Sequence, residues 1–139
     1  MKVELKRVND AVHFEASATS SSVKVHIDGS PDMGGLGLGV RPMEMVLMAL
    51  ASCTSLDLVS ILRKQKQDLK DLSVSVEGKR REQIPTTFTK IHMSFTLKGS
   101  IDPGKANRAA ELAVKKYCSV HDMLVAGVVE ITYSLEIVS

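Results

Sequence analysis

The sequence predicts an α+β fold with the element order βββ-α-ββ-α-β. Apolar and polar residues alternate through the first third of the chain, which is typical of strands. A helical pattern begins at Pro42, and two further alternating segments, a second helical pattern and a final alternating segment follow. Strands and helices do not alternate regularly, so the pattern does not favour a parallel doubly wound sheet.

The first three strands are indicated by apolar residues at every second position. Asn9-Asp10 supplies a turn after the first strand, and the TSSS run at 19–22 supplies a turn after the second. Short turns of this kind predict antiparallel pairing. The apolar positions are Val3 and Leu5, then Val12, Phe14 and Ala16, then Val23, Val25 and Ile27.

The segment 29–40 contains five of the nine glycines and is expected to be a loop. Its GGLGLG run superficially resembles a nucleotide-binding loop. However, a third glycine after Gly37 and Gly39 would fall at Pro42, and no βαβ unit surrounds the run. We therefore expect a flexible connection.

The helical pattern that begins at Pro42 extends to about Gln67. Its first half is apolar on every side, which predicts a helix enclosed all round, with the RKQKQD run at 63–68 emerging into solvent. This helix is expected to be the spine of the fold.

The second half of the chain predicts two strands, a helix, a short helical turn and a last strand. Asp102-Pro103 has the form of an N-cap followed by proline at the first helical position. We expect Ser119 to cap a short turn through Leu124 and Gly127 to end it. The strands carry Leu72, Val74 and Val76, then Ile91, Met93, Phe95 and Leu97, then Ile131, Tyr133, Leu135 and Ile137, and the helix carries Ala106, Ala109, Ala110, Ala113 and Val114.

Composition limits the classes of function. The 139 residues are 44% hydrophobic and 24% charged, which predicts one globular domain over residues 1–139. A net charge of +2 and an aromatic content of 4% give no support for nucleic-acid binding. No leader-like segment follows Met1 and no apolar run approaches the roughly 20 residues of a membrane span, so we expect a cytoplasmic protein without a membrane partner.

The two cysteines, Cys53 and Cys118, are too few for a structural zinc cluster, and a reducing cytosol disfavours a permanent disulfide. Cys53 lies in the run SCTSLD, with Asp57 one helical turn later on the same face and Ser60 beyond it. A cysteine in an apolar helix is often an inert core residue. The polar neighbours leave open the alternative that Cys53 is reactive.

A reactive Cys53 would need help to ionise, because a cysteine reacts as the thiolate. Cys53 is too far inside the helix for the dipole to act on it, and Asp57 would oppose ionisation by like-charge repulsion. A cation from elsewhere is therefore required, and Arg41, Arg80 and Arg81 are the candidates on loops. Glu44, at the third helical position, is either a cap of the helix start or a catalytic residue that orients an arginine.

The four histidines give no metal-ligand spacing. His13, His26 and His92 fall on the exposed phase of strands and are interpreted as solvated side chains. His121 is three residues past Cys118, where it either touches that thiol or begins a helix.

Three segments together resemble the OsmC/Ohr family of thiol-dependent peroxide-resistance proteins, and in particular its YhfA-like branch. They are SPDMGGLGLGVRPMEMVLMALASC, LDLVSILRKQ and, after the first cysteine, KKYCSV. The resemblance implies an intertwined homodimer in which long central helices are wrapped by antiparallel sheets. It also implies that Cys53 attacks an organic hydroperoxide and that Cys118 resolves the product as a disulfide, with an external dithiol as reductant and no metal or other cofactor.

The chain departs from the peroxidase members of this family at two places. Those members carry an arginine in an early glycine-rich hairpin, and the corresponding ASATSSS stretch has none. Their catalytic glutamate directly follows the proline, where this chain has Met43 with Glu44 one residue later. Arg81 is the candidate substitute for the missing arginine. The alternative function is a non-catalytic module that binds a small apolar or electrophilic ligand at the dimer interface.

Overall fold

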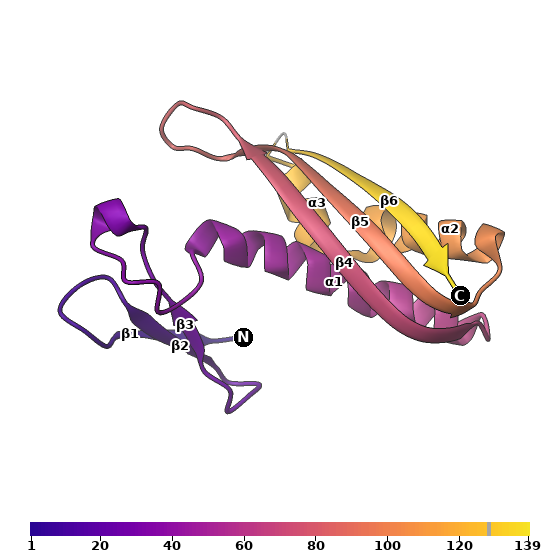
Figure 1. Ribbon diagram of the computed structural model, residues 1–139, viewed down its shortest axis with the longest axis horizontal. Coiled ribbons are helices and arrows are strands. Elements are labelled where there is room, and N and C mark those ends of the chain that lie inside the picture. The colour runs from indigo at the N-terminus through magenta and orange to yellow at the C-terminus, as the bar shows by residue number, and fades with distance from the viewer. Residues whose placement is uncertain (128) are drawn as a thin grey trace. The chain divides into compact units, whose positions relative to one another are not determined.

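The computed structural model describes residues 1–127 and 129–139 (Figure 1). These residues form two compact units, Met1–Val46 and Leu47–Ser139. The expected single domain stays a prediction. The expected α+β class is confirmed, with two three-stranded sheets and helices.

The first unit holds the antiparallel sheet β1-β2-β3. The strands are β1 (Val3–Arg7), β2 (Phe14–Ala18) and β3 (Val25–Ile27), close to the three alternating segments predicted. A short 3-10 helix, η1 (Pro31–Met33), follows. Few side chains are buried in this unit, and apolar residues such as Val3 and Leu5 are 65% and 57% exposed.

The glycine-rich segment after β3 is organised by one buried carboxylate. Asp28 is 1% exposed, and its side chain accepts backbone N–H groups of Gly29 at 2.8 Å, Leu36 at 2.9 Å and Leu38 at 3.0 Å. The hydrogen bond from Leu38 is the largest of the effects that hold the pKa of Asp28 below its ordinary value. The prediction of a flexible connection did not take this carboxylate into account. The carboxylate pairs with backbone N–H groups of the loop that would otherwise lack a hydrogen-bond acceptor.

Helix α1 (Pro42–Lys64) begins at the predicted proline and ends earlier than Gln67. Lys66 adopts a left-handed conformation with φ 55°, and Gln67 donates its N–H to the carbonyl of Leu62 at 3.0 Å. Lys66 donates in turn to the carbonyl of Arg63. These two bonds form the Schellman arrangement that closes a helix.

The burial of α1 differs from the prediction of a helix enclosed on every side. Only one side of the helix is covered by other parts of the chain that the structure describes. The buried residues form one stripe at four-residue spacing, and they are Leu50, Thr54, Leu58 and Leu62. The apolar side chains of Met48 and Leu56 are 52% and 73% exposed. The helix is also long and apolar enough to cross a membrane by length and composition, a test that the core helix of a soluble protein also passes.

The second unit holds the sheet β4-β5-β6, in which β5 is central (Figure 1). Strands β4 (Asp68–Arg80) and β5 (Phe88–Ser100) form a long antiparallel hairpin, as predicted. Strand β6 (Glu130–Val138) pairs with β5 in parallel, from Lys90↔Glu130 to Lys98↔Val138. The expectation of purely antiparallel sheets therefore misses this pair, which requires a crossover connection.

The crossover consists of three helical segments. They are α2 (Pro103–Leu112), the π-helical segment η2 (Ala113–Tyr117) and α3 (Ser119–Val125). The side chain of Asp102 accepts the N–H of Lys105 at 2.8 Å, which confirms the predicted N-cap. Cys118, rather than the predicted Ser119, caps α3, because the helix starts one residue earlier than the sequence suggested.

The core of the second unit lies on one face of its sheet. The predicted inward residues of β5 are each at most 1% exposed, and they are Ile91, Met93, Phe95 and Leu97. The Thr54 hydroxyl approaches the sulfur of Met93 at 3.7 Å, which places α1 on that face. The predicted apolar stripe of the second helical pattern is buried as well, and its alanines leave room for close packing.

Candidate functional site

The candidate site is a pair of cysteines in the second unit. Cys53 lies in the middle of α1, directly before the buried Thr54, and is half-buried. Because consecutive helical residues are about 100° apart, Cys53 lies at the border between the packed and the open side of the helix. This position keeps its sulfur accessible while the backbone is fixed by a helix. Asp57 is half-buried one turn later, and Ser60 is exposed.

Cys118 lies where the crossover passes from η2 into α3, and it is 3% exposed. Its backbone is extended, with φ −71° and ψ 106°, and its Sγ accepts the backbone N–H of His121 at 3.3 Å. The thiol therefore acts as the N-cap of α3, as a serine or aspartate oxygen does at many helix starts. His121 does both things expected of it, since it stands in the first turn of a helix and contacts this sulfur.

The structure brings the two cysteines together. Burial is the largest of the effects that together raise the pKa of the Cys118 thiol to about 11, and the neighbouring Cys53 side chain also acts to raise it. The N–H of His121 acts in the opposite direction. Cys118 is therefore a neutral thiol near pH 7, and it lies close to Cys53. Both cysteines are free.

The imidazole of His121 adds no positive charge to this pair. Burial is the largest effect that lowers its pKa below the ordinary value, and the nearby charge of Lys115 lowers it as well, while Asp122 acts to raise it. A histidine with a lowered pKa is neutral at physiological pH. We conclude that His121 serves the site through its backbone N–H.

Arg80 and Arg81 are engaged by the loop between β4 and β5. The Nε atom of Arg80 donates to the carbonyl of Thr86 at 2.5 Å, and that of Arg81 donates to the carbonyl of Pro85 at 2.6 Å. These guanidinium groups hold their own hairpin closed. Among the described residues, no hydrogen bond or ion pair joins a cation to Cys53.

Arg41 and Glu44 form the start of α1. Glu44 accepts the backbone N–H of Arg41 at 2.8 Å through Oε2, which is the bond that an N3 glutamate makes in a capping box. The charge of Arg41 also contributes, after a hydrogen bond from Ser30, to lowering the pKa of Asp32. Glu44 thus has the geometry of the cap that its spacing suggested, and its catalytic role stays a prediction.

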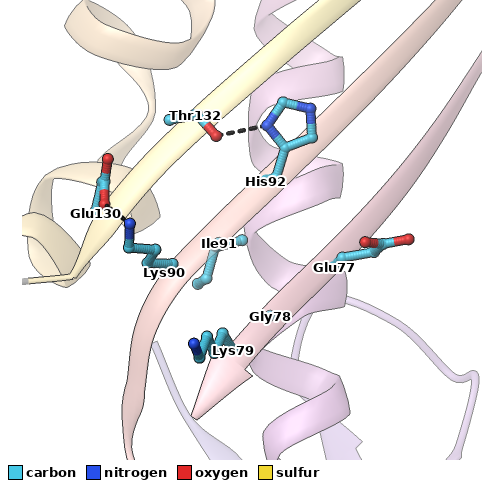
Figure 2. A pocket seen from close by; sticks show the side chains of 8 residues that line it. All are labelled: Glu77, Gly78, Lys79, Lys90, Ile91, His92, Glu130 and Thr132. Carbon is cyan, nitrogen blue, oxygen red and sulfur yellow. Dashed lines mark hydrogen bonds and ion pairs between the residues drawn. The ribbon is translucent and has the colours of Figure 1, made fainter. Parts of the chain in front are cut away.

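A separate hollow of about 350 Å³ lies on the outward face of the second sheet (Figure 2). His92 lines the hollow and shares a hydrogen bond with the Thr132 hydroxyl at 2.5 Å. Lys90 forms an ion pair with Glu130 at 3.0 Å. No cysteine lines it. The hollow is lined by Glu77, Gly78, Lys79, Lys90, Ile91, His92, Glu130 and Thr132.

The fold and the paired thiols define a small α+β protein with a two-cysteine site. The OsmC-like protein family model matches residues 34–134. The chain is 44% identical over 99 residues to protein YhfA of Escherichia coli K12, over 70% of this chain and 73% of YhfA. The chain therefore belongs to the OsmC-like protein family.

Solved structures agree with this assignment. A hypothetical protein from Aquifex aeolicus superposes with a TM-score of 0.81 at 27% identity, over 99% of this chain and 97% of that protein. A protein from Legionella pneumophila, described as an organic hydroperoxide resistance protein OsmC, gives a TM-score of 0.71 at 17% identity, over 98% and 97% of the two chains. At that identity the second comparison supports the fold alone.

Proposed function

We propose that the protein is a thiol-dependent reductase of organic hydroperoxides, with Cys53 as the peroxidatic and Cys118 as the resolving cysteine. The observation that carries the proposal is the unequal environment of two neighbouring thiols. Cys53 is half-buried and reachable, whereas Cys118 is 3% exposed and has a pKa raised by burial to about 11. A peroxidatic sulfur must meet substrate, and a resolving sulfur must meet only its partner.

The proposed reaction has three balanced steps. The thiolate of Cys53 attacks the terminal peroxide oxygen, the O–O bond breaks, and the alkoxide takes a proton from solvent to leave as the alcohol. The Cys118 thiol then attacks the sulfenic acid on Cys53, which releases water and forms a disulfide. An external dithiol reduces that disulfide through a mixed disulfide and is itself oxidised to a disulfide. No metal or flavin takes part.

Cys118 also assists the first step in this proposal. Its neutral thiol supplies a hydrogen-bond donor beside the sulfur of Cys53, and a donor stabilises a neighbouring anion. This contact replaces part of the stabilisation that a guanidinium supplies in other members of the family. We also propose that Asp57, one turn along α1, orients water or the leaving alcohol.

The protein is proposed to work as a homodimer. The open side of α1 carries the exposed apolar residues Met48 and Leu56, beside a surface hollow that includes Val59 and Arg63. A second copy would cover this surface and complete the burial that the apolar sequence of α1 predicts. In a dimer of this kind, Arg81 or Arg41 of the other subunit is the candidate cation for Cys53.

The test is consumption of cumene hydroperoxide with dithiothreitol as the reductant. We expect turnover by the wild type and none by Cys53→Ser. In the absence of dithiothreitol, Cys118→Ser should consume one equivalent of peroxide and keep a sulfenic acid on Cys53, whereas the wild type should form a disulfide. Ser52→Ala is the matched control, because Ser52 neighbours Cys53 on the same helix and its hydroxyl bonds to the carbonyls of Met48 and Ala49 in its own helix. Full turnover by Cys53→Ser would refute the proposal.

A second candidate function is a binding module for a small electrophile. The engagement of Arg80 and Arg81 by their own hairpin favours it, because a thiolate without a cation is a slower nucleophile. The same assay decides between the two. A wild type that consumes no peroxide, yet forms a stable adduct at Cys53 with an electrophile such as iodoacetamide, supports the binding module.

A further inference from the structure

A second pair of potential ligands lies in the first unit, apart from the thiols. The Nε2 atom of His13 and the Nδ1 atom of His26 are 2.9 Å apart, and the ring centroids are 5.1 Å apart at an interplanar angle of 38°. The antiparallel pairing of β2 with β3 brings them together, since Phe14 and Ile27 are register partners. The interpretation of these histidines as separate solvated side chains is corrected by this contact.

Both histidines are anchored through their backbones. The N–H of His13 donates to Oδ1 of Asn9 at 3.2 Å, and its carbonyl accepts the N–H of Val8 at 3.0 Å. The carbonyl of His26 accepts the N–H of Val40 at 3.0 Å. Gly39 packs so closely on the backbone of His26 that a Cβ there would lie 2.4 Å from its carbonyl carbon. The backbones from which the two imidazoles project are therefore fixed.

The nitrogen separation matches one coordination geometry better than another. Imidazole nitrogens bind transition metals at about 2.0–2.1 Å. Two such bonds at about 90°, as in square-planar or tetragonal sites, place the nitrogens about 2.9 Å apart, whereas a tetrahedral angle places them about 3.3 Å apart. The separation of 2.9 Å fits the first case, which is the preferred geometry of divalent copper and nickel.

Two carboxylates are among the charged groups near the pair. The buried carboxylate of Asp28 is close enough to His13 for their charges to interact. Glu15 is the register partner of His26, and its carboxylate lies 3.4 Å from Nζ of Lys24, an exposed and therefore weak ion pair. Lys6 is also the register partner of Glu15, so two acidic groups and two lysines lie near the imidazoles.

We propose that His13 and His26 form a two-imidazole chelate for a divalent late transition metal of tetragonal preference, copper or nickel. Binding replaces the hydrogen bond between the rings by two nitrogen–metal bonds. Within residues 1–127 and 129–139, no group of three His, Cys, Asp or Glu side chains is gathered for a metal, so water fills the remaining positions. The site is independent of the cysteine chemistry proposed above.

The test is isothermal titration of the full chain with nickel chloride, which does not oxidise thiols as copper does. We expect one equivalent of bound metal, and a loss of at least about tenfold in affinity for both His13→Asn and His26→Asn, because each change removes one of two ligands. His92→Asn is the matched control, since His92 also lies on a sheet surface but bonds to hydroxyls of Thr132 and Ser134. It should bind as the wild type does.

A spectroscopic measurement locates the metal in the unmodified chain. Substoichiometric copper should broaden the imidazole proton resonances of His13 and His26 and leave those of His92 sharp. Nickel affinity unchanged in both His13→Asn and His26→Asn, or broadening that spares these two rings, would overturn the proposal.

Discussion

The Sγ atom of Cys118 accepts the backbone N–H of His121 at 3.3 Å, so a thiol begins helix α3. The same sulfur is the neighbour of Cys53. One atom therefore serves both the local structure of the crossover and the candidate chemistry.

The cap makes Cys118→Ala more destabilising than Cys118→Ser. Serine retains an oxygen that can accept the N–H of His121, whereas alanine leaves that donor without its partner, and loss of an N-cap costs about 1 kcal/mol. The free energy of unfolding of both variants, measured by urea titration, checks this difference. Equal stabilities for the two variants would mean that the sulfur contact contributes nothing.

The raised pKa of Cys118 predicts a loss of stability in alkali. The folded-state value of about 11 lies above the ordinary value of 9.0, so the unfolded chain releases this proton first. The contribution is complete below about pH 9 and is lost as the pH rises through about 11. We expect the free energy of unfolding to fall more steeply over this interval in the wild type than in Cys118→Ser. Parallel curves would contradict the assignment.

Asp28 predicts a change of the opposite sign in acid. Its pKa is lowered from 3.8 chiefly by the N–H of Leu38, so its contribution is present above pH 3.8 and is lost as the pH falls through the folded-state value. Asp28→Asn should unfold more readily at pH 7 and lose less stability on acidification than the wild type. Asp10→Asn, at an exposed turn, is the control and should follow the wild-type acid curve.

Lys66 offers a stabilising substitution. Its φ of 55° strains the backbone of a residue that has a Cβ but does not strain glycine. Lys66→Gly should therefore stabilise the fold by about 0.5–1 kcal/mol. Lys64→Gly, two residues earlier and inside α1, should instead destabilise it by a similar amount. Thermal unfolding of the two variants gives the comparison. A destabilised Lys66→Gly would show that the lysine side chain makes a contact worth more than the backbone strain.

The sequence predicts most of the fold because the patterns involved are local. Alternation in β5 predicts four of its five buried hydrophobic residues, from Ile91 to Leu97, and misses Phe88, while the Asp102-Pro103 pair locates the start of α2. The family resemblance of the glycine loop and the cysteine segments is confirmed by the family match. These signals need no knowledge of what each segment packs against.

The misses concern contacts that no local pattern encodes. The parallel pairing of β6 depends on the path of the crossover. The end of α1 depends on Lys66, which adopts a left-handed backbone conformation that glycine usually occupies. The hydrogen bonds of Asp28 and the His13 and His26 pair arise from strand register and loop closure. An aspartate directly before a glycine-rich segment was the signal available for the first of these, since carboxylates commonly bind loop N–H groups.

The crossover also sets the order in which the thiols can meet during biosynthesis. Cys53 leaves the ribosome well before Cys118, and the crossover that carries Cys118 is completed when β6 joins β5 as its parallel neighbour. Such long-range pairing is slow compared with hairpin closure. A nascent chain therefore presents Cys53 as a solitary thiol, open to oxidants and to foreign disulfides, until the last strand has been made.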